Sequence, residues 1–163
     1  MREWLHARMP QHHIAQLNVG RLLAPLEDPL IDGFRALLAP INALADAAPG
    51  FVWRLQDEAG DATSIRPFED TTVLVNYSIW ETPEDLWNFA YRSRHLEPLR
   101  QRRAWFETPR EPHVVLFWIP AGTRPDIEEA KRRLAHLRAH GPTPYAFTFQ
   151  ERFPAPDEAL AAT

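Results

Sequence analysis

The alternation of hydrophobic and polar positions predicts several strands along this chain. Residues 13–19 place Ala15, Leu17 and Val19 on one face and more polar residues on the other, a pattern typical of a half-buried strand. Residues 51–56 and 72–80 are predicted to form two further strands. Residues 113–119 are apolar at nearly every position, as expected for a strand that is covered on both faces.

Helical spacing separates these strands. Apolar residues recur every three or four positions from Leu30 to Leu44, where Pro40 predicts a kink or a break into two shorter helices. The sequence 82–85 predicts a capped helix start, and a proline is expected to bend or restart this helix before the basic segment 99–106. Residues 126–140 predict a later helix that ends at a glycine. The alternation at 145–149 then predicts a last strand.

The order of these elements predicts an α+β fold of the ferredoxin-like, split βαβ type, with an antiparallel sheet, helices on one face, and an added C-terminal helix and strand. A sheet with helices on one face must cover its other face, and a second copy of the chain usually does so. We therefore expect a homodimer. The domain is predicted to span residues 12–150, between an N-terminal arm at 1–11 and a loose tail at 151–163 that is rich in proline and alanine.

Composition excludes several functions. A chain of 163 residues with 45% hydrophobic content is sufficient for one core. A net charge of −4 disfavours nucleic acid as a partner. Cysteine is absent, so neither disulfides nor thiolate metal sites are expected, and a reducing cytoplasm is the predicted location. We expect no membrane partner, because polar residues or prolines interrupt every apolar run, and no glycine-rich phosphate loop indicates a nucleotide cofactor.

The segment 76–95 predicts where a ligand would bind. A strand runs there directly into a helix that carries many aromatic residues and His95. A seam of aromatic side chains between a sheet and a helix is suited to hold a small apolar or aromatic ligand.

Several segments together resemble the domain-of-unknown-function 3291 family: 13–18, 50–55, 91–95, 103–106 and 141–149. This family is similar in fold to the dimeric α-β barrel superfamily, which includes antibiotic-biosynthesis monooxygenases and haem-degrading monooxygenases. The resemblance implies a fold and does not establish a reaction.

The resemblance also suggests three catalytic candidates. A histidine at the place of His95 ligates iron in the haem-degrading relatives, although a lone histidine on such a helix is more often a packing residue. Cofactor-independent relatives use an asparagine and a tryptophan to position an aromatic substrate, which points to Asn18 and Trp80. Asn18 suits an enolate or phenolate oxygen, and a structural role for a buried strand asparagine is equally expected.

Further residues are predicted to contact the ligand through guanidinium groups or aromatic rings. The alternative for the arginines is that they pair with nearby acidic residues. The alternative for the tryptophans is that they are core residues. The basic cluster of Arg100, Arg102 and Arg103 is predicted to be the solvated face of a helix. The predicted ligand-binding residues are Trp53, Arg54, Tyr91, Arg92, Trp105 and Trp118.

Two functions of different classes follow. The first is a cofactor-independent, monooxygenase-like enzyme that acts on an aromatic or polyketide-like molecule. The second is a non-catalytic protein that binds haem or another apolar ligand. No metal site is predicted. The ligand site is expected to need no cofactor, and haem binding is the alternative. A scaffold protein whose own tryptophans fill the pocket is a third possibility, which a structure without a cavity would favour.

Overall fold

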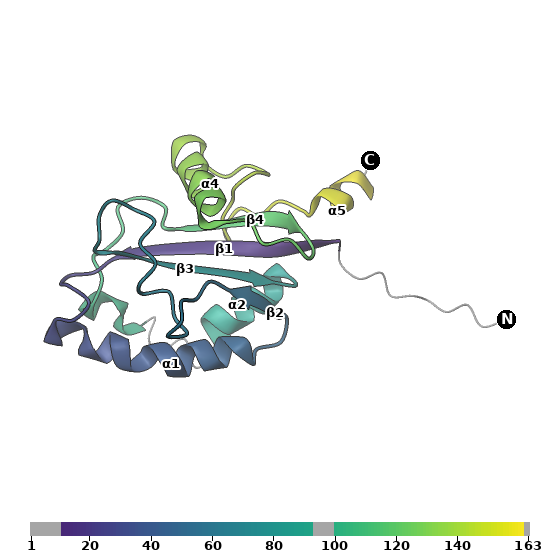
Figure 1. The fold of residues 1–163 in the computed structure, drawn as a ribbon. Coiled ribbons are helices and arrows are strands. Elements are labelled where there is room, and N and C mark those ends of the chain that lie inside the picture. The colour runs from purple at the N-terminus through teal and green to yellow at the C-terminus, as the bar shows by residue number, and fades with distance from the viewer. Residues whose placement is uncertain (1–10, 93–99, 162–163) are drawn as a thin grey trace.

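The structure is a computed structural model that describes residues 11–92 and 100–161. Within these ranges, a four-stranded antiparallel sheet has the strand order β2-β3-β1-β4. The sheet and its helices confirm the α+β, ferredoxin-like arrangement predicted from the sequence (Figure 1). The elements are β1 (His12–Arg21), η1 (Pro29–Ile31), α1 (Asp32–Asp46), β2 (Phe51–Arg54), β3 (Val73–Trp80), α2 (Pro83–Arg92), η2 (Arg102–Ala104), β4 (Val114–Pro120), α4 (Ile127–His140) and α5 (Pro156–Ala161).

Successive residues of the central strand β1 face opposite sides of the sheet, because side chains alternate along a strand. Ala15, Leu17 and Val19 pack in one cluster with residues of α4. Gln16 and Asn18 face the other side, where α1 and α2 lie (Figure 1). The two faces therefore differ in character, one wholly apolar and one partly polar.

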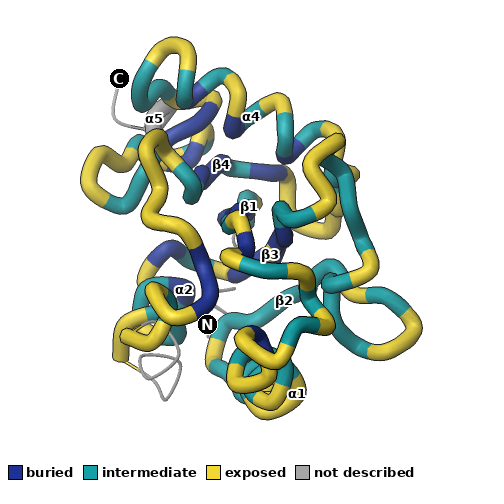
Figure 2. Tube along the Cα trace, turned by 90° about the vertical axis from the view of Figure 1, so that its left-hand side faces the viewer, coloured by how far each residue is buried: buried dark blue, intermediate teal, exposed yellow. Residues whose placement is uncertain are grey.

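Helix α4 covers the apolar face of the sheet from within the same chain (Figures 1 and 2). Leu134 and Leu137 of α4 are buried in a cluster with Leu17 and Phe117, and both of these sheet residues are 0% exposed. The face for which the sequence argument required a second copy is thus already covered. The homodimer stays a prediction.

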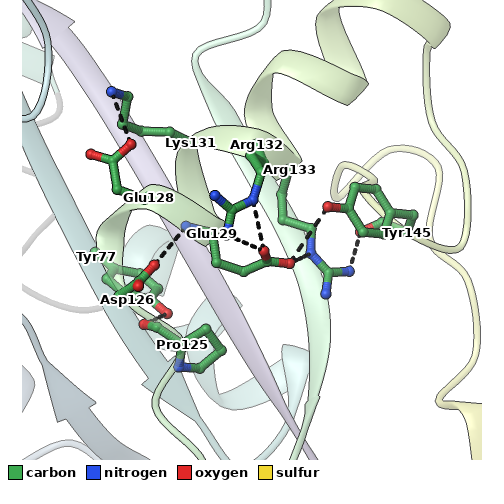
Figure 3. Close-up of polar contacts among 9 residues, drawn as sticks. All are labelled: Tyr77, Pro125, Asp126, Glu128, Glu129, Lys131, Arg132, Arg133 and Tyr145. Atoms are coloured by element: carbon green, nitrogen blue, oxygen red, sulfur yellow. Dashed lines mark hydrogen bonds and ion pairs between the residues drawn. The ribbon is translucent and has the colours of Figure 1, made fainter.

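Polar contacts tie the segment before α4 to the sheet and α4 to the loop at Tyr145 (Figure 3). The Tyr77 hydroxyl donates to the Pro125 carbonyl oxygen at 2.7 Å, and burial raises the pKa of this hydroxyl, so it stays protonated. Arg133 donates to Glu129 at 2.8 Å, and its guanidinium carbon lies 3.9 Å from the centroid of the Tyr145 ring. The Glu129 carboxylate is stabilised by the neighbouring arginines, which lowers its pKa. These contacts are structural and lie on the face opposite α1 and α2.

Two predicted features of the helices and strands differ from the structure. Of the kink or break predicted at Pro40, the break is absent, because helix α1 continues through this residue. Proline removes one helical hydrogen bond, from the carbonyl of Ala36, and both residues are exposed, so water can solvate that carbonyl. The predicted strand at 145–149 is wrong: it is reduced to a single bridge between Phe147 and Leu116 of β4. Residues 143–146 form a tight turn that prevents longer pairing.

Residues 151–161, for which the proline and alanine content predicts a loose tail, make specific contacts with the sheet. The carbonyl oxygen of Phe153 accepts a hydrogen bond from the Trp118 indole at 2.8 Å, and Ala155 is buried. Asp157 in α5 lies 2.8 Å from the Nδ1 atom of His12 at the start of β1. One aromatic anchor and one polar contact thus hold the segment to the sheet.

Candidate functional site

A cavity of about 220 Å³ lies between the sheet and helices α1 and α2. Strands β1 and β3 form its floor, α1 and α2 form its walls, and η2 with the two residues after it closes one end. A cavity of about 150 Å³ is large enough to bind benzene in a protein core. The volume here therefore suits a molecule with one or two aromatic rings.

The cavity accounts for the incomplete burial of α1. Phe34, Leu37, Leu38 and Ile41 form the apolar stripe of this helix and line the cavity. An amphipathic helix normally buries such a stripe against the core. In α1 only Ala45 is buried. Phe34 and Leu37 pack at one end against the cluster that contains Trp105 and Phe106, and the stripe as a whole borders the cavity above the sheet.

The floor carries polar side chains at alternate positions of two neighbouring strands. Gln16 stands opposite Ser78, and Asn18 stands opposite Asn76. The Gln16 amide nitrogen donates to Asn76 Oδ1 at 2.6 Å and to Ser78 Oγ at 2.8 Å. The Trp80 indole also donates to Ser78 Oγ, at 2.9 Å. Buried polar groups need such partners, so this network holds the floor in one arrangement.

Asn18 and Asn76 retain hydrogen-bonding capacity toward the cavity. In the described part of the chain, the Asn18 carboxamide has no side-chain hydrogen bond, and the Asn76 amide nitrogen has no acceptor. Asn76 is exposed although it lies in the middle of a central strand, because the cavity is open to solvent. A carbonyl, hydroxyl or oxyanion of a ligand can therefore meet two carboxamides side by side.

Arg102 lines the closed end of the cavity, which corrects the prediction that it belongs to a solvated helix face. Its guanidinium carbon lies 4.9 Å from the centroid of the Phe106 ring. A Cβ atom on Gly20 would stand 3.0 Å from Arg102 Nη2, so the glycine leaves room for this side chain. Arg100 and Arg103 are exposed, as predicted. Burial lowers the pKa of Arg102, which still carries its charge near neutral pH.

A second arginine, Arg54, lies among the lining residues contributed by β2 and the loop that follows it. Its Nε and Nη2 atoms donate to the two carboxylate oxygens of Asp46, at 2.8 and 3.2 Å. Its Nη1 atom donates to the Gly60 carbonyl oxygen at 2.6 Å. These contacts tie β2 to the end of α1 and use every nitrogen of the guanidinium. Arg54 is therefore a structural part of the wall.

The pKa of His113 depends on the positive charge at the closed end of the cavity. It precedes β4, and its carbonyl oxygen accepts a hydrogen bond from Val19 at 2.9 Å. Burial lowers the pKa of His113, and the positive charges of Arg102 and Arg138 lower it further. The imidazole is consequently neutral at neutral pH.

The structure brings together some of the residues predicted from the sequence. Asn18, Arg54 and Trp105 line the cavity. Trp80 is 1% exposed, stacks on Phe89 with ring centroids 5.1 Å apart, and supports the floor through its bond to Ser78. Its indole nitrogen is thus already occupied.

Other predicted residues lie elsewhere. Trp53 packs on Tyr77 on the α4 side, with ring centroids 5.3 Å apart. Trp118 donates to the C-terminal segment, and Tyr91 and Arg92 are exposed on α2 outside the cavity lining. His95 lies outside the described residues, so its role stays a prediction.

Sequence reasoning missed Arg102 and the polar ladder of the floor. A usable signal was present for each. A glycine inside a strand, here Gly20, marks a close approach by another group. Asn76 and Ser78 interrupt an apolar strand at a spacing of two, which puts both on one face.

Comparison with known protein families places the chain in one of them. The family described as "Domain of unknown function (DUF3291)" matches residues 13–163. The chain belongs to the DUF3291 family. No curated protein matches the sequence of this DUF3291 protein.

Solved structures resemble the DUF3291 chain only distantly. PA3566 of Pseudomonas aeruginosa has 14% identity and a TM-score of 0.46, and the match covers 70% of this chain and 98% of that one. A Nitrosomonas europaea protein assigned as an antibiotic biosynthesis monooxygenase has 13% identity and a TM-score of 0.43, over 69% and 92% of the two chains. A Chloroflexus aurantiacus protein with the same assignment has 14% identity and a TM-score of 0.41, over 71% and 98%. Similarities of this size assign no activity.

Among the described residues that line the cavity of the DUF3291 chain, none is placed to serve as an axial ligand of haem. Histidine, cysteine and methionine are absent from the described residues that line the cavity, and the hydroxyl of Tyr77 is bonded to Pro125 on the other face. The volume is also below the roughly 300–1,000 Å³ of sites for drug-sized ligands. These residues do not fit haem, and the haem alternative depends on His95 alone.

Within residues 11–92 and 100–161, neither a cluster of three metal-ligating side chains nor a helix long and apolar enough to cross a membrane occurs.

Proposed function

We propose that this DUF3291 protein binds a small aromatic or polyketide-like molecule in the cavity between the sheet and helices α1 and α2. The observation that carries the proposal is the pair of carboxamides, Asn18 and Asn76, on the floor of a cavity with apolar walls. Ligand sites combine apolar walls with a few polar groups that orient the ligand. An oxygen on the ring system would meet the carboxamides, while the ring itself lies against the stripe of α1.

The binding experiment uses isothermal titration calorimetry with 1-naphthol and 1,4-dihydroxynaphthalene. Asn42→Trp places an indole in the cavity, because Asn42 of α1 is a lining residue. Ala43→Trp adds the same bulk at the next, exposed position and serves as the matched control. We expect binding to the wild type and to Ala43→Trp, and a loss of at least about tenfold in affinity for Asn42→Trp. Equal affinity for both tryptophan variants, or no binding of either compound, would refute the proposal.

Turnover is a separate question at the same site. In the enzymatic version, Asn18 donates a hydrogen bond to a developing enolate or phenolate oxygen of the substrate. Asn18→Ala then reduces oxygen uptake with 1,4-dihydroxynaphthalene by about 100-fold or more, whereas binding weakens far less. A protein that binds the quinol with no oxygen uptake above the uncatalysed rate is a binder and not a monooxygenase.

Haem titration tests the alternative ligand. A Soret band that forms with the wild type and disappears in His95→Ala would support haem binding through His95. An identical spectrum for the two proteins would remove that alternative.

A further inference from the structure

The hydrogen-bonding edge of Arg102 has no partner. Its Nε and Nη2 atoms are screened from solvent and, within the described part of the chain, make no hydrogen bond. These two nitrogens form the parallel edge that holds a carboxylate through two hydrogen bonds. Arg54 shows the same edge in use, since its Nε and Nη2 atoms hold both oxygens of Asp46. Arg102 therefore has two donors that can hold an anion.

The register of the sheet places Arg102 relative to the polar floor. The side chain of Arg102 lies against Gly20, which pairs with Leu74. Two residues further along each strand, Asn18 pairs with Asn76. Two residues of a strand span about 7 Å. The cationic end and the carboxamides are thus separated by roughly the distance between the two substituents of a para-substituted benzene ring.

We propose that the cavity binds an aromatic carboxylate, with Arg102 on the carboxylate and with Asn18 and Asn76 on a second oxygen across the ring. This inference rests on the proposed function and names its ligand class. The guanidinium rotates away from Gly20 and the Phe106 ring to reach the ligand. Pairing a buried charge that otherwise has no partner favours this movement.

The remaining charges agree with an anionic ligand. The Asp61 carboxylate also lines the cavity, and it accepts hydrogen bonds from the backbone and hydroxyl of Thr63, at 2.9 and 2.6 Å. Asp46 is held by Arg54. Among the described charges of the lining, Arg102 is thus the one that has no partner. It provides a local attraction for anions in a chain whose net charge is −4.

A matched pair of ligands tests the inference by calorimetry. The probes are 4-hydroxybenzoate and its neutral analogue 4-hydroxybenzamide. We expect the wild type to bind the acid at least about tenfold more tightly than the amide. In Arg102→Met the affinity for the acid falls by at least about tenfold, and the affinity for the amide stays within about twofold. Arg103→Met, which changes an exposed neighbour, leaves both affinities unchanged.

The outcomes separate this inference from the proposed function. Equal affinity for acid and amide in the wild type, with both blocked by Asn42→Trp, would overturn the carboxylate assignment and leave the pocket in place. The same holds if 1-naphthol binds while neither benzene derivative does. Loss of acid binding in Arg103→Met as well as in Arg102→Met would also overturn it, because the effect would then be one of overall charge. If no aromatic compound binds, the proposed function fails too.

Discussion

Replacing Arg102 by methionine should stabilise the protein, although it removes a charged residue from a net acidic chain. Arg102 keeps two screened donors without partners in the described residues. Each unsatisfied buried donor costs about 1–3 kcal/mol. Arg102 is only partly buried, so about 1 kcal/mol for each donor is the appropriate value. Methionine has similar length, carries no donor and adapts to irregular space.

One favourable contact is lost in the exchange. The guanidinium lies over the Phe106 ring at 4.9 Å, and such a contact contributes about 0.5–1 kcal/mol. Subtracting it from about 2 kcal/mol leaves a gain of about 1 kcal/mol in the free energy of unfolding. For a chain of 163 residues, this gain raises Tm by about 2–4 °C.

Urea and thermal unfolding at pH 7 measure this effect. The urea midpoint should rise in Arg102→Met while the slope of the transition stays constant. Arg103→Met, at an exposed position, should change the free energy of unfolding by less than about 0.5 kcal/mol. A clear loss of stability in Arg102→Met would refute the reasoning, because it would show that the guanidinium has a partner in the chain.

Three further predictions concern the floor, the α4 face and the closed end. Ser78→Ala removes the acceptor of two donors, including the Trp80 indole, and should lower the free energy of unfolding by about 1–3 kcal/mol in urea titrations. Leu134→Ala, at a position 1% exposed under α4, should cost about 2–5 kcal/mol and leave the mass measured by light scattering unchanged. His113 has a lowered pKa in the folded state, so the unfolded chain takes up a proton near the ordinary value of 6.5 and stability should fall as the pH drops below it. Arg102→Met should raise the pKa of His113 in an NMR titration and shrink that loss; an unchanged pKa would contradict the argument.

Most of the fold could be predicted because its signals are local. The alternation of β1, the capped helix start at 82–85 and the stop at Gly141 each depend on a few neighbouring residues, and the structure confirms all three. The placement of α4 could not be predicted in the same way, because an amphipathic stripe does not specify which face of a sheet it covers. The strand predicted at 145–149 failed for a similar reason, since pairing depends on a partner and on the turn at 143–146.

The site was harder to predict than the fold. Asn18 could be proposed only through the family resemblance, because a polar residue on the more polar face of a half-buried strand is ordinary by itself. Trp53 and Trp118 could not be separated from Trp105 by residue type, because all three are large aromatics in amphipathic segments. Only the packing of the chain places Trp105 in the cavity lining and the other two outside it.

The two arginines of the cavity show how local inconsistency indicates a binding site. The charge of Arg54 is paired with Asp46, and each of its guanidinium nitrogens makes a hydrogen bond. Replacing Arg54 should therefore lower the free energy of unfolding and leave the preference for an acid over its amide unchanged. Arg102 should lower stability where it stands, and it lies beside a floor where, within the described residues, the Asn18 carboxamide and the Asn76 amide nitrogen have no hydrogen-bond partner. Residues that destabilise a fold tend to be retained at functional sites. A single variant, Arg102→Met, should therefore raise Tm and abolish the preference for an acid over its amide, a combination that a purely structural arginine would not produce.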